Sequence, residues 1–270
     1  MNKVVSLGSS FSAGGGLYLE EVHTLYNEKL NIKYNRDDLS NVVYGGILAK
    51  KLNCEFENLS KCGVGVDYIF RKFWEYFESN KCDDTLFLIE IPGSWYRLDM
   101  FSNKIKKHLI VNVNDEVGEH IHITDDYITR HEGLNEFMGK EITDGLIDYF
   151  KNWYSADILN NKQMYQVITF LNFLIQKNIN FLFLPTVQED RFYPMLEKYF
   201  DTEKFCINFE KYGIMERGPD GINFDMFDWA NVNSFIIRDD LKEKDSDSHI
   251  GILGYKKISE IIYESINNRR

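Results

Sequence analysis

Short apolar segments, each followed by a turn that carries glycine, constrain the fold of this 270-residue chain more than any other feature. Residues 4–7 and 86–91 are almost continuously apolar, which is typical of strands buried on both faces of a parallel sheet. Residues 53–59 alternate apolar and polar side chains and indicate another strand. Residues 69–77 then place Ile and aromatic side chains on one face of a helix. This order predicts an α/β fold, with three α/β/α layers around a mostly parallel central sheet of about five strands.

The remaining periodic segments extend this pattern over one domain that spans residues 1–270. Helices are predicted at residues 42–52, 142–150, 164–175, 192–199 and 253–266, and strands at residues 181–185 and 205–207. Residues 17–30 fit either a helix or a long loop, and residues 213–228 indicate a loop that covers a pocket. The stretch around residues 101–140 breaks the alternation and is interpreted as an insertion on the main sheet. Within it, residues 109–113 and 120–123 predict a β-hairpin.

The charge and the cysteine content limit the kinds of binding partner and the cellular compartment that we expect for this protein. The formal net charge of −11 argues against a general affinity for nucleic acid or for anionic membranes. The four cysteines show no CxxC spacing, which fits free thiols in a reducing compartment. The first apolar run is too short for a signal peptide, and no segment reaches the length of a transmembrane helix. We therefore expect a cytoplasmic protein without nucleic-acid or membrane partners, and its oligomeric state stays open.

Residues at the two ends of the chain supply the groups that nucleophilic acyl transfer needs. Ser10 lies in the glycine-rich turn after the first apolar run, and His249 follows Asp247 just before the last helix. Taken singly, each is equally explained as an ordinary turn residue. Together they provide a hydroxyl, an imidazole to take its proton, and a carboxylate to fix the ring tautomer. In the predicted sheet order, both ends of the chain lie near the same edge of the strands.

The turn at Ser10 resembles the first sequence block of the SGNH (GDSL-type) hydrolases, Gly-Asp-Ser-x-Ser/Thr-x-Gly. Residues 8–14 match this block at every marked place except Ser9. The resemblance implies an SGNH, flavodoxin-like fold with Ser10 as nucleophile and as part of the oxyanion hole. It assigns a second backbone donor of that hole to Gly63, in the turn after the second predicted strand. It also assigns the triad base to His249 and the triad acid to Asp247, with Asp245 as a second candidate.

Two departures from the family pattern bear on activity. Ser9 replaces the acidic residue that normally braces the first turn. Ser94 replaces the asparagine of the third block, whose side chain would complete the oxyanion hole. Losing one such donor can cost about two to four kcal/mol of transition-state stabilisation. The Ser94 hydroxyl or the Trp95 N–H could substitute, and Trp95 and Arg97 are candidates for binding the substrate.

These observations predict a serine esterase that cleaves a small acyl ester, such as an O-acetyl group on a carbohydrate or another soluble substrate. An acyltransferase on the same fold and a catalytically silent binding or structural module are the alternatives. A nucleotide site at residues 14–16 is disfavoured, because neither a P-loop string nor a GxGxxG pattern is present. No cofactor is expected. His120 and His122 would share one face of the hairpin, but without a third ligand nearby we expect no metal site.

Overall fold

The central sheet consists of four parallel strands. The structure is a computed structural model, and it describes residues 1–92, 97–103, 106–112, 121–123, 139–141, 144–145, 148, 152, 156–186, 192–212, 226, 229–230, 233–242 and 249–269. The strands are ordered β2-β1-β3-β7, with bounds β1 (Lys3–Leu7), β2 (Glu55–Asn58), β3 (Thr85–Pro92) and β7 (Asn180–Thr186). At the predicted fifth strand there is instead an isolated parallel bridge between Cys206 and Phe183. The predicted α/β fold class is confirmed.

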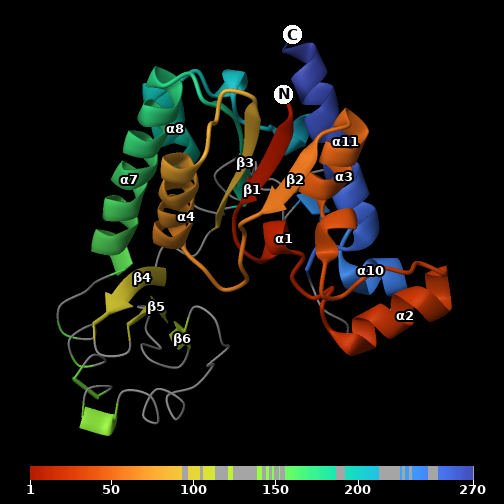
Figure 1. Cartoon of the computed structure of the whole chain (residues 1–270), viewed down its shortest axis with the longest axis horizontal. Coiled ribbons are helices and arrows are strands. Elements are labelled where there is room, and N and C mark those ends of the chain that lie inside the picture. Colours follow the sequence, from red (N-terminus) through yellow and green to blue (C-terminus); the bar gives the residue numbers. More distant parts are fainter. Residues whose placement is uncertain are drawn as a thin grey trace.

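Helices cover both faces of this sheet, which gives the three predicted layers (Figure 1). One face is covered by α3 (Tyr44–Leu52) and α11 (Ile252–Asn268), and the other by α4 (Val66–Ser79) and α7 (Ala156–Gln176). Successive strand residues point to opposite faces, so a strand with helices on both sides is expected to be largely apolar. Accordingly, alternate residues of β1 and β3 belong to the two separate cores.

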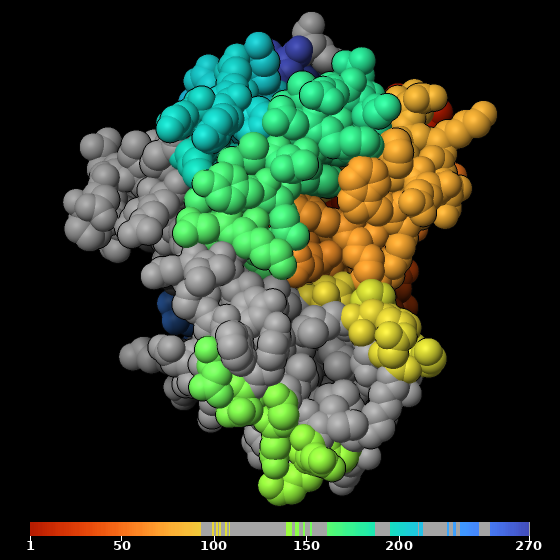
Figure 2. Space-filling view, turned by 90° about the vertical axis from the view of Figure 1, so that its left-hand side faces the viewer, coloured from red at the N-terminus to blue at the C-terminus, as the bar shows by residue number. Residues whose placement is uncertain are grey.

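Most of the apolar stripe predicted at residues 69–77 is core and packs α4 against the sheet and against α7, whereas Trp74 of the same stripe is exposed. The Phe73 ring is fully buried and lies 5.2 Å from Phe87 of β3 and 4.8 Å from Phe170 of α7, between ring centroids. Figure 2 shows the outer surfaces of α7 and α4 side by side. Between them runs an open groove of about 520 Å³, bordered by the partly exposed Trp74 and Tyr165.

Shorter elements connect these layers, and among them α8 has the predicted bounds of 192–199. Residues 17–30, for which the sequence fits either a helix or a long loop, contain a helix over residues 20–30. The remaining elements are α1 (Ser10–Ala13), α2 (Glu20–Leu30), η1 (Leu39–Asn41), α8 (Phe192–Tyr199), η2 (Thr202–Lys204), η3 (Phe209–Tyr212) and α10 (Ile237–Leu241). The helix predicted at 142–150 and the loop predicted at 213–228 fall largely outside the described residues. None of the described helices combines the length and apolar character needed to cross a bilayer.

A second, antiparallel sheet begins just before the predicted insertion at residues 101–140 and extends into it. Its strands are β4 (Arg97–Ser102), β5 (Lys107–Asn112) and β6 (Ile121–Ile123). The pairing of β5 with β6 confirms the predicted hairpin, and β4 is an additional strand that the sequence pattern did not reveal. Asp99 of β4 ties this sheet to α4, because its carboxylate accepts from Arg71 Nε at 2.5 Å. The same carboxylate contacts His108 Nδ1 of β5 at 2.9 Å.

Candidate active site

The candidate site lies where β1 and β2 end, at the edge of the sheet opposite the chain termini (Figure 1). The turn after β2 is attached to the turn after β1 by two hydrogen bonds. Lys61 N–H donates to the Gly8 carbonyl at 3.1 Å, and Asn58 Nδ2 donates to the Ser12 carbonyl at 3.1 Å. Gly63 follows in this second turn with φ of 77°, a left-handed conformation that favours glycine. The turns that carry Ser10 and Gly63 are therefore neighbours.

Ser10 is the first residue of the four-residue helix α1, and its side chain is partly exposed. The helix is followed by Gly14, which has a φ of 86°, in the left-handed region that favours glycine. The flanking serines differ from Ser10, because both are buried and hydrogen-bonded. The Ser12 hydroxyl contacts the Tyr44 hydroxyl, and the Ser9 hydroxyl donates to the Glu90 carboxylate.

The imidazole of His249 lies beside Ser10, although 239 positions separate the two residues in the sequence. Both side chains lie against the backbone of Gly15. A Cβ atom built on this glycine would lie 2.8 Å from His249 Nε2 and 2.9 Å from Ser10 Cβ. Nε2 and Ser10 Cβ are thus separated by no more than the sum of these distances. The Phe11 ring packs beside the imidazole, with 5.7 Å between ring centroids. The structure therefore places the Ser10 side chain and the imidazole, which the sequence singled out, against the same glycine.

Backbone hydrogen bonds hold the segment that carries His249. Ile250 forms an antiparallel bridge with Ile236, and the Ile237 N–H donates to the His249 carbonyl at 2.8 Å. On the other side of the bridge, the Gly251 N–H donates to the Phe235 carbonyl at 2.8 Å. The start of α10 and the residues just before it therefore hold the backbone that follows the imidazole, on both sides of Ile250.

A buried carboxylate, that of Asp240, anchors the start of α11 directly after this bridge. The Asp240 carboxylate accepts from the Tyr26 hydroxyl at 2.6 Å and from the Leu253 N–H at 3.2 Å. The Tyr26 hydroxyl in turn accepts from the Ile252 N–H at 3.1 Å. Burial raises the pKa of Asp240, while the hydrogen bond from Tyr26 acts in the opposite direction. This anchor was not predicted from the sequence, where Asp240 is one of many acidic residues in a charged stretch.

The other unpredicted residue is Glu90, which lies fully buried near the end of β3. One of its carboxylate oxygens accepts from the Ser12 N–H at 2.7 Å and from the Ser9 N–H at 3.2 Å, and the other accepts from the Ser9 hydroxyl. Gly8 leaves room for this contact, because a Cβ there would lie 2.5 Å from Glu90 Oε2. Glu90 therefore holds the turn of Ser10 from the neighbouring strand.

A signal for Glu90 was present in the sequence. A charged residue that interrupts the apolar run of a fully buried strand must find hydrogen-bond donors or stay neutral. Within β3, the side chain of Glu90 points to the same face as Leu86 and Leu88, where an apolar residue is expected. The apolar run predicts the strand, but it does not indicate that the carboxylate reaches the Ser10 turn.

Folding stability should depend on pH through Glu90. Burial raises the pKa of this carboxyl, and the hydrogen bonds from Ser12 and Ser9 oppose the shift without cancelling it. The folded state then binds the proton more readily than the unfolded state. The stability that Glu90 contributes is therefore full below its ordinary pKa and decreases as the pH rises through the raised value. Urea unfolding of wild type and Glu90→Gln at acidic and neutral pH should show the variant gaining relative stability at neutral pH. A difference that is independent of pH would contradict this assignment.

The remaining predicted site residues stay predictions. Ser94, Trp95, Asp245 and Asp247 lie outside the described residues. Arg97 is described only through its backbone, which pairs with Asn112 at the start of β4. Within the part of the chain that the structure describes, no three His, Cys, Asp or Glu residues lie close enough together to hold a metal ion. His120 is also outside this part, and of His122 only the backbone is described.

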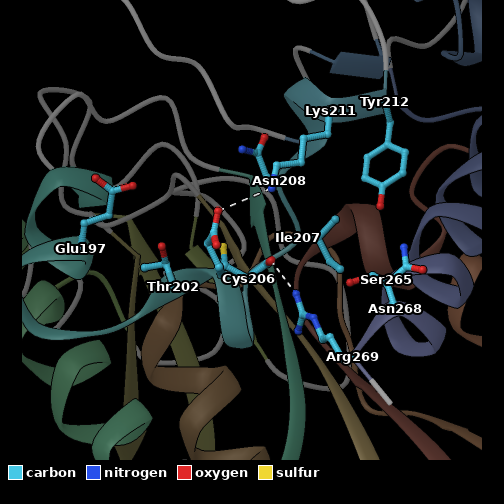
Figure 3. A pocket seen from close by; sticks show the side chains of 11 residues that line it. Glu197, Thr202, Cys206, Ile207, Asn208, Lys211, Tyr212, Ser265, Asn268 and Arg269 are labelled. Carbon is cyan, nitrogen blue, oxygen red and sulfur yellow. Dashed lines mark hydrogen bonds and ion pairs between the residues drawn. The ribbon is translucent and has the colours of Figure 1, made fainter.

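A cavity of about 310 Å³ lies away from this site, between α8, η2, η3 and the end of α11 (Figure 3). Its wall includes Arg269, whose guanidinium donates to the carbonyls of Lys204 and Cys206, both at 2.8 Å. None of Ser10, Gly63 or His249 lines it. The elements that border it, α8 and the end of α11, lie toward the end of the molecule where the chain termini are found (Figure 1), so the cavity plays no part in the candidate site.

Comparison with known proteins adds one distant structural likeness. No family model and no curated protein matches the sequence. The structure is similar to that of a "putative lipolytic protein of G-D-S-L family" from Desulfitobacterium hafniense DCB-2, at 10% sequence identity and a TM-score of 0.42. The likeness covers 98% of this chain and 99% of the other.

Proposed function

We propose that this protein is a serine ester hydrolase in which Ser10 is the nucleophile and His249 the general base. The observation that carries the proposal is the meeting of the Ser10 side chain and His249 Nε2 over Gly15. A hydroxyl beside an imidazole, at the carboxyl end of a parallel strand, is the arrangement that activates serine for acyl transfer. Both residues are partly exposed, so a substrate can reach them.

The proposed reaction proceeds in two steps. Ser10 Oγ transfers its proton to His249 Nε2 and bonds to the acyl carbon, and the alkoxy group leaves with the proton from His249. Water then attacks the acyl-enzyme, His249 takes a proton from it, and the carboxylic acid is released as the proton returns to Ser10. The backbone N–H groups of Ser10 and Gly63 are the proposed donors to the oxyanion. Asp247, or Asp245 in its place, is the proposed partner of the other ring nitrogen.

The proposed substrate is a small acyl ester, such as an acetyl group on a carbohydrate or on another soluble molecule. This choice follows from the resemblance of the Ser10 turn to the SGNH hydrolases. An acyltransferase would use the same acyl-enzyme and replace water by an acceptor hydroxyl. Release of free carboxylic acid in the absence of any added acceptor distinguishes the hydrolase from the transferase.

The proposal is tested by labelling the folded protein with a fluorophosphonate, which reacts with activated serines. Digestion and mass spectrometry should then place the label on Ser10. An exposed serine far from the site, Ser79 at the end of α4, provides the internal control and should stay unmodified. Folded protein that carries no label at Ser10 would contradict the proposal and favour the silent binding or structural module.

A further inference from the structure

We propose that Glu90 is a positioning residue for Ser10, and that it supplies from β3 the carboxylate that the turn itself lacks. This inference rests on the proposed function, because it concerns how the nucleophile is held. Its basis is the set of three hydrogen bonds that the Glu90 carboxylate accepts from Ser9 and Ser12, the residues on either side of Ser10 and Phe11.

The geometry identifies the task that Glu90 performs. Ser9 occupies the N-cap position of α1, but its side chain makes no capping hydrogen bond. An N-cap side chain usually accepts from the backbone N–H of the second or third helical residue. Here the third residue is Ser12, and its N–H donates to Glu90 at 2.7 Å instead. The Ser9 hydroxyl, which would normally accept, is turned into a donor to the same carboxylate.

The contact fixes the helical turn against the sheet as well as capping it. Glu90 belongs to β3, which pairs in parallel with β1 up to Leu7, immediately before the turn. The carboxylate is completely buried, so the bonds that it accepts do not compete with solvent. The Glu90 side chain therefore holds the backbone on either side of Ser10, at Ser9 and at Ser12. Loss of that side chain should displace Ser10 relative to His249.

The geometry also implies that one carboxylate, at position 9 or at position 90, is enough to accept from the Ser12 N–H. Carboxylates at both positions would conflict. An aspartate at position 9 could cap the Ser12 N–H itself, as N-cap aspartates do. With Glu90 still present, however, two carboxylates would face each other in a buried site, which disfavours the charged forms of both. Glu90→Gln removes this conflict, because the amide can donate to the new carboxylate. Ser9→Asp and Glu90→Gln should thus compensate each other.

The test is a double-mutant cycle read by the rate of fluorophosphonate labelling at Ser10 and by thermal unfolding. Ser9→Asp should label about a hundredfold more slowly than wild type, because a displaced nucleophile loses reactivity. The double variant Ser9→Asp/Glu90→Gln should label at least about tenfold faster than Ser9→Asp alone, the size of coupling expected for residues in contact. Glu90→Gln alone should retain most of the rate, whereas Glu90→Ala should lose it. Glu57→Ala is the matched control, because Glu57 pairs with Lys3 on the neighbouring strand, away from the turn.

The outcomes separate this inference from the proposed function. If wild type is not labelled at Ser10, the proposed function fails and Glu90 has no nucleophile to position. If wild type is labelled and a folded Glu90→Ala protein is labelled at the same rate, only the role of Glu90 is overturned. The same holds if Glu90→Gln makes the Ser9→Asp protein slower or leaves its rate unchanged. A purely structural role would shift the unfolding temperature of these variants without restoring the labelling rate in the double variant.

Discussion

Alanine at position 10 is expected to lower ester hydrolysis by at least about a thousandfold, because loss of the nucleophile leaves only binding and oxyanion stabilisation. The folding stability should change little, since the Ser10 side chain is partly exposed. Ser9 and Ser12 cannot take over its role. Both are buried, and their hydroxyls are engaged with Glu90 and Tyr44.

The measurement is the initial rate of hydrolysis of a small chromogenic acetyl ester, with circular dichroism to establish that the variant is folded. Ser79→Ala provides the matched serine control, because Ser79 is exposed at the end of α4. That control should hydrolyse the ester at the wild-type rate. Should Ser10→Ala do so too, the esterase activity would reside elsewhere or the reaction would not use a serine nucleophile.

The fold could be predicted from the sequence because its signals are local and repeated. Strands β1, β3 and β7 are buried on both faces, so their apolar runs distinguish them from amphipathic helices such as α4. The fifth strand predicted at residues 205–207 is reduced to a single parallel bridge between Cys206 and Phe183 of β7, in which the Phe183 N–H donates to the Phe205 carbonyl at 2.8 Å. An apolar run of three residues indicates burial, but it does not determine whether several hydrogen bonds form with the neighbouring strand.

The candidate site was predictable only in part, for a different physical reason. Ser10 and His249 carry recognisable chemistry, and the chain order places both near one edge of the sheet. The roles of Glu90 and Asp240 could not be predicted, because they depend on contacts with residues distant in the sequence. Glu90 contacts the turn 78 positions before it, and Asp240 contacts a tyrosine 214 positions away. The sequence marks Glu90 as a charged residue within an apolar run, but it indicates a partner for neither Glu90 nor Asp240.

Replacing Gly15 by alanine should push the proposed nucleophile, Ser10, away from the proposed base, His249. The backbone at Gly15 does not lie in the left-handed region, so an alanine can adopt it without strain. Its Cβ, however, would lie 2.6 Å from His249 Cδ2 and 2.9 Å from Ser10 Cβ. These separations are too short for non-bonded carbon atoms, so the imidazole or the serine must move. A displacement of about 1 Å between reacting groups can lower a rate by about a hundredfold, which is the loss we expect for ester hydrolysis.

The control for this variant is Gly145→Ala, because a Cβ at Gly145 would meet no atom within 4 Å. That variant should hydrolyse the ester and react with the fluorophosphonate like wild type. Gly15→Ala should stay folded while both rates fall together, since each reaction requires the proposed proton transfer from Ser10 to His249. If Ser10→Ala is inactive but folded Gly15→Ala retains full activity, the imidazole that lies against Gly15 is not the base. Ser10 would then have to be activated by another group, and the contact between the two ends of the chain would serve stability alone.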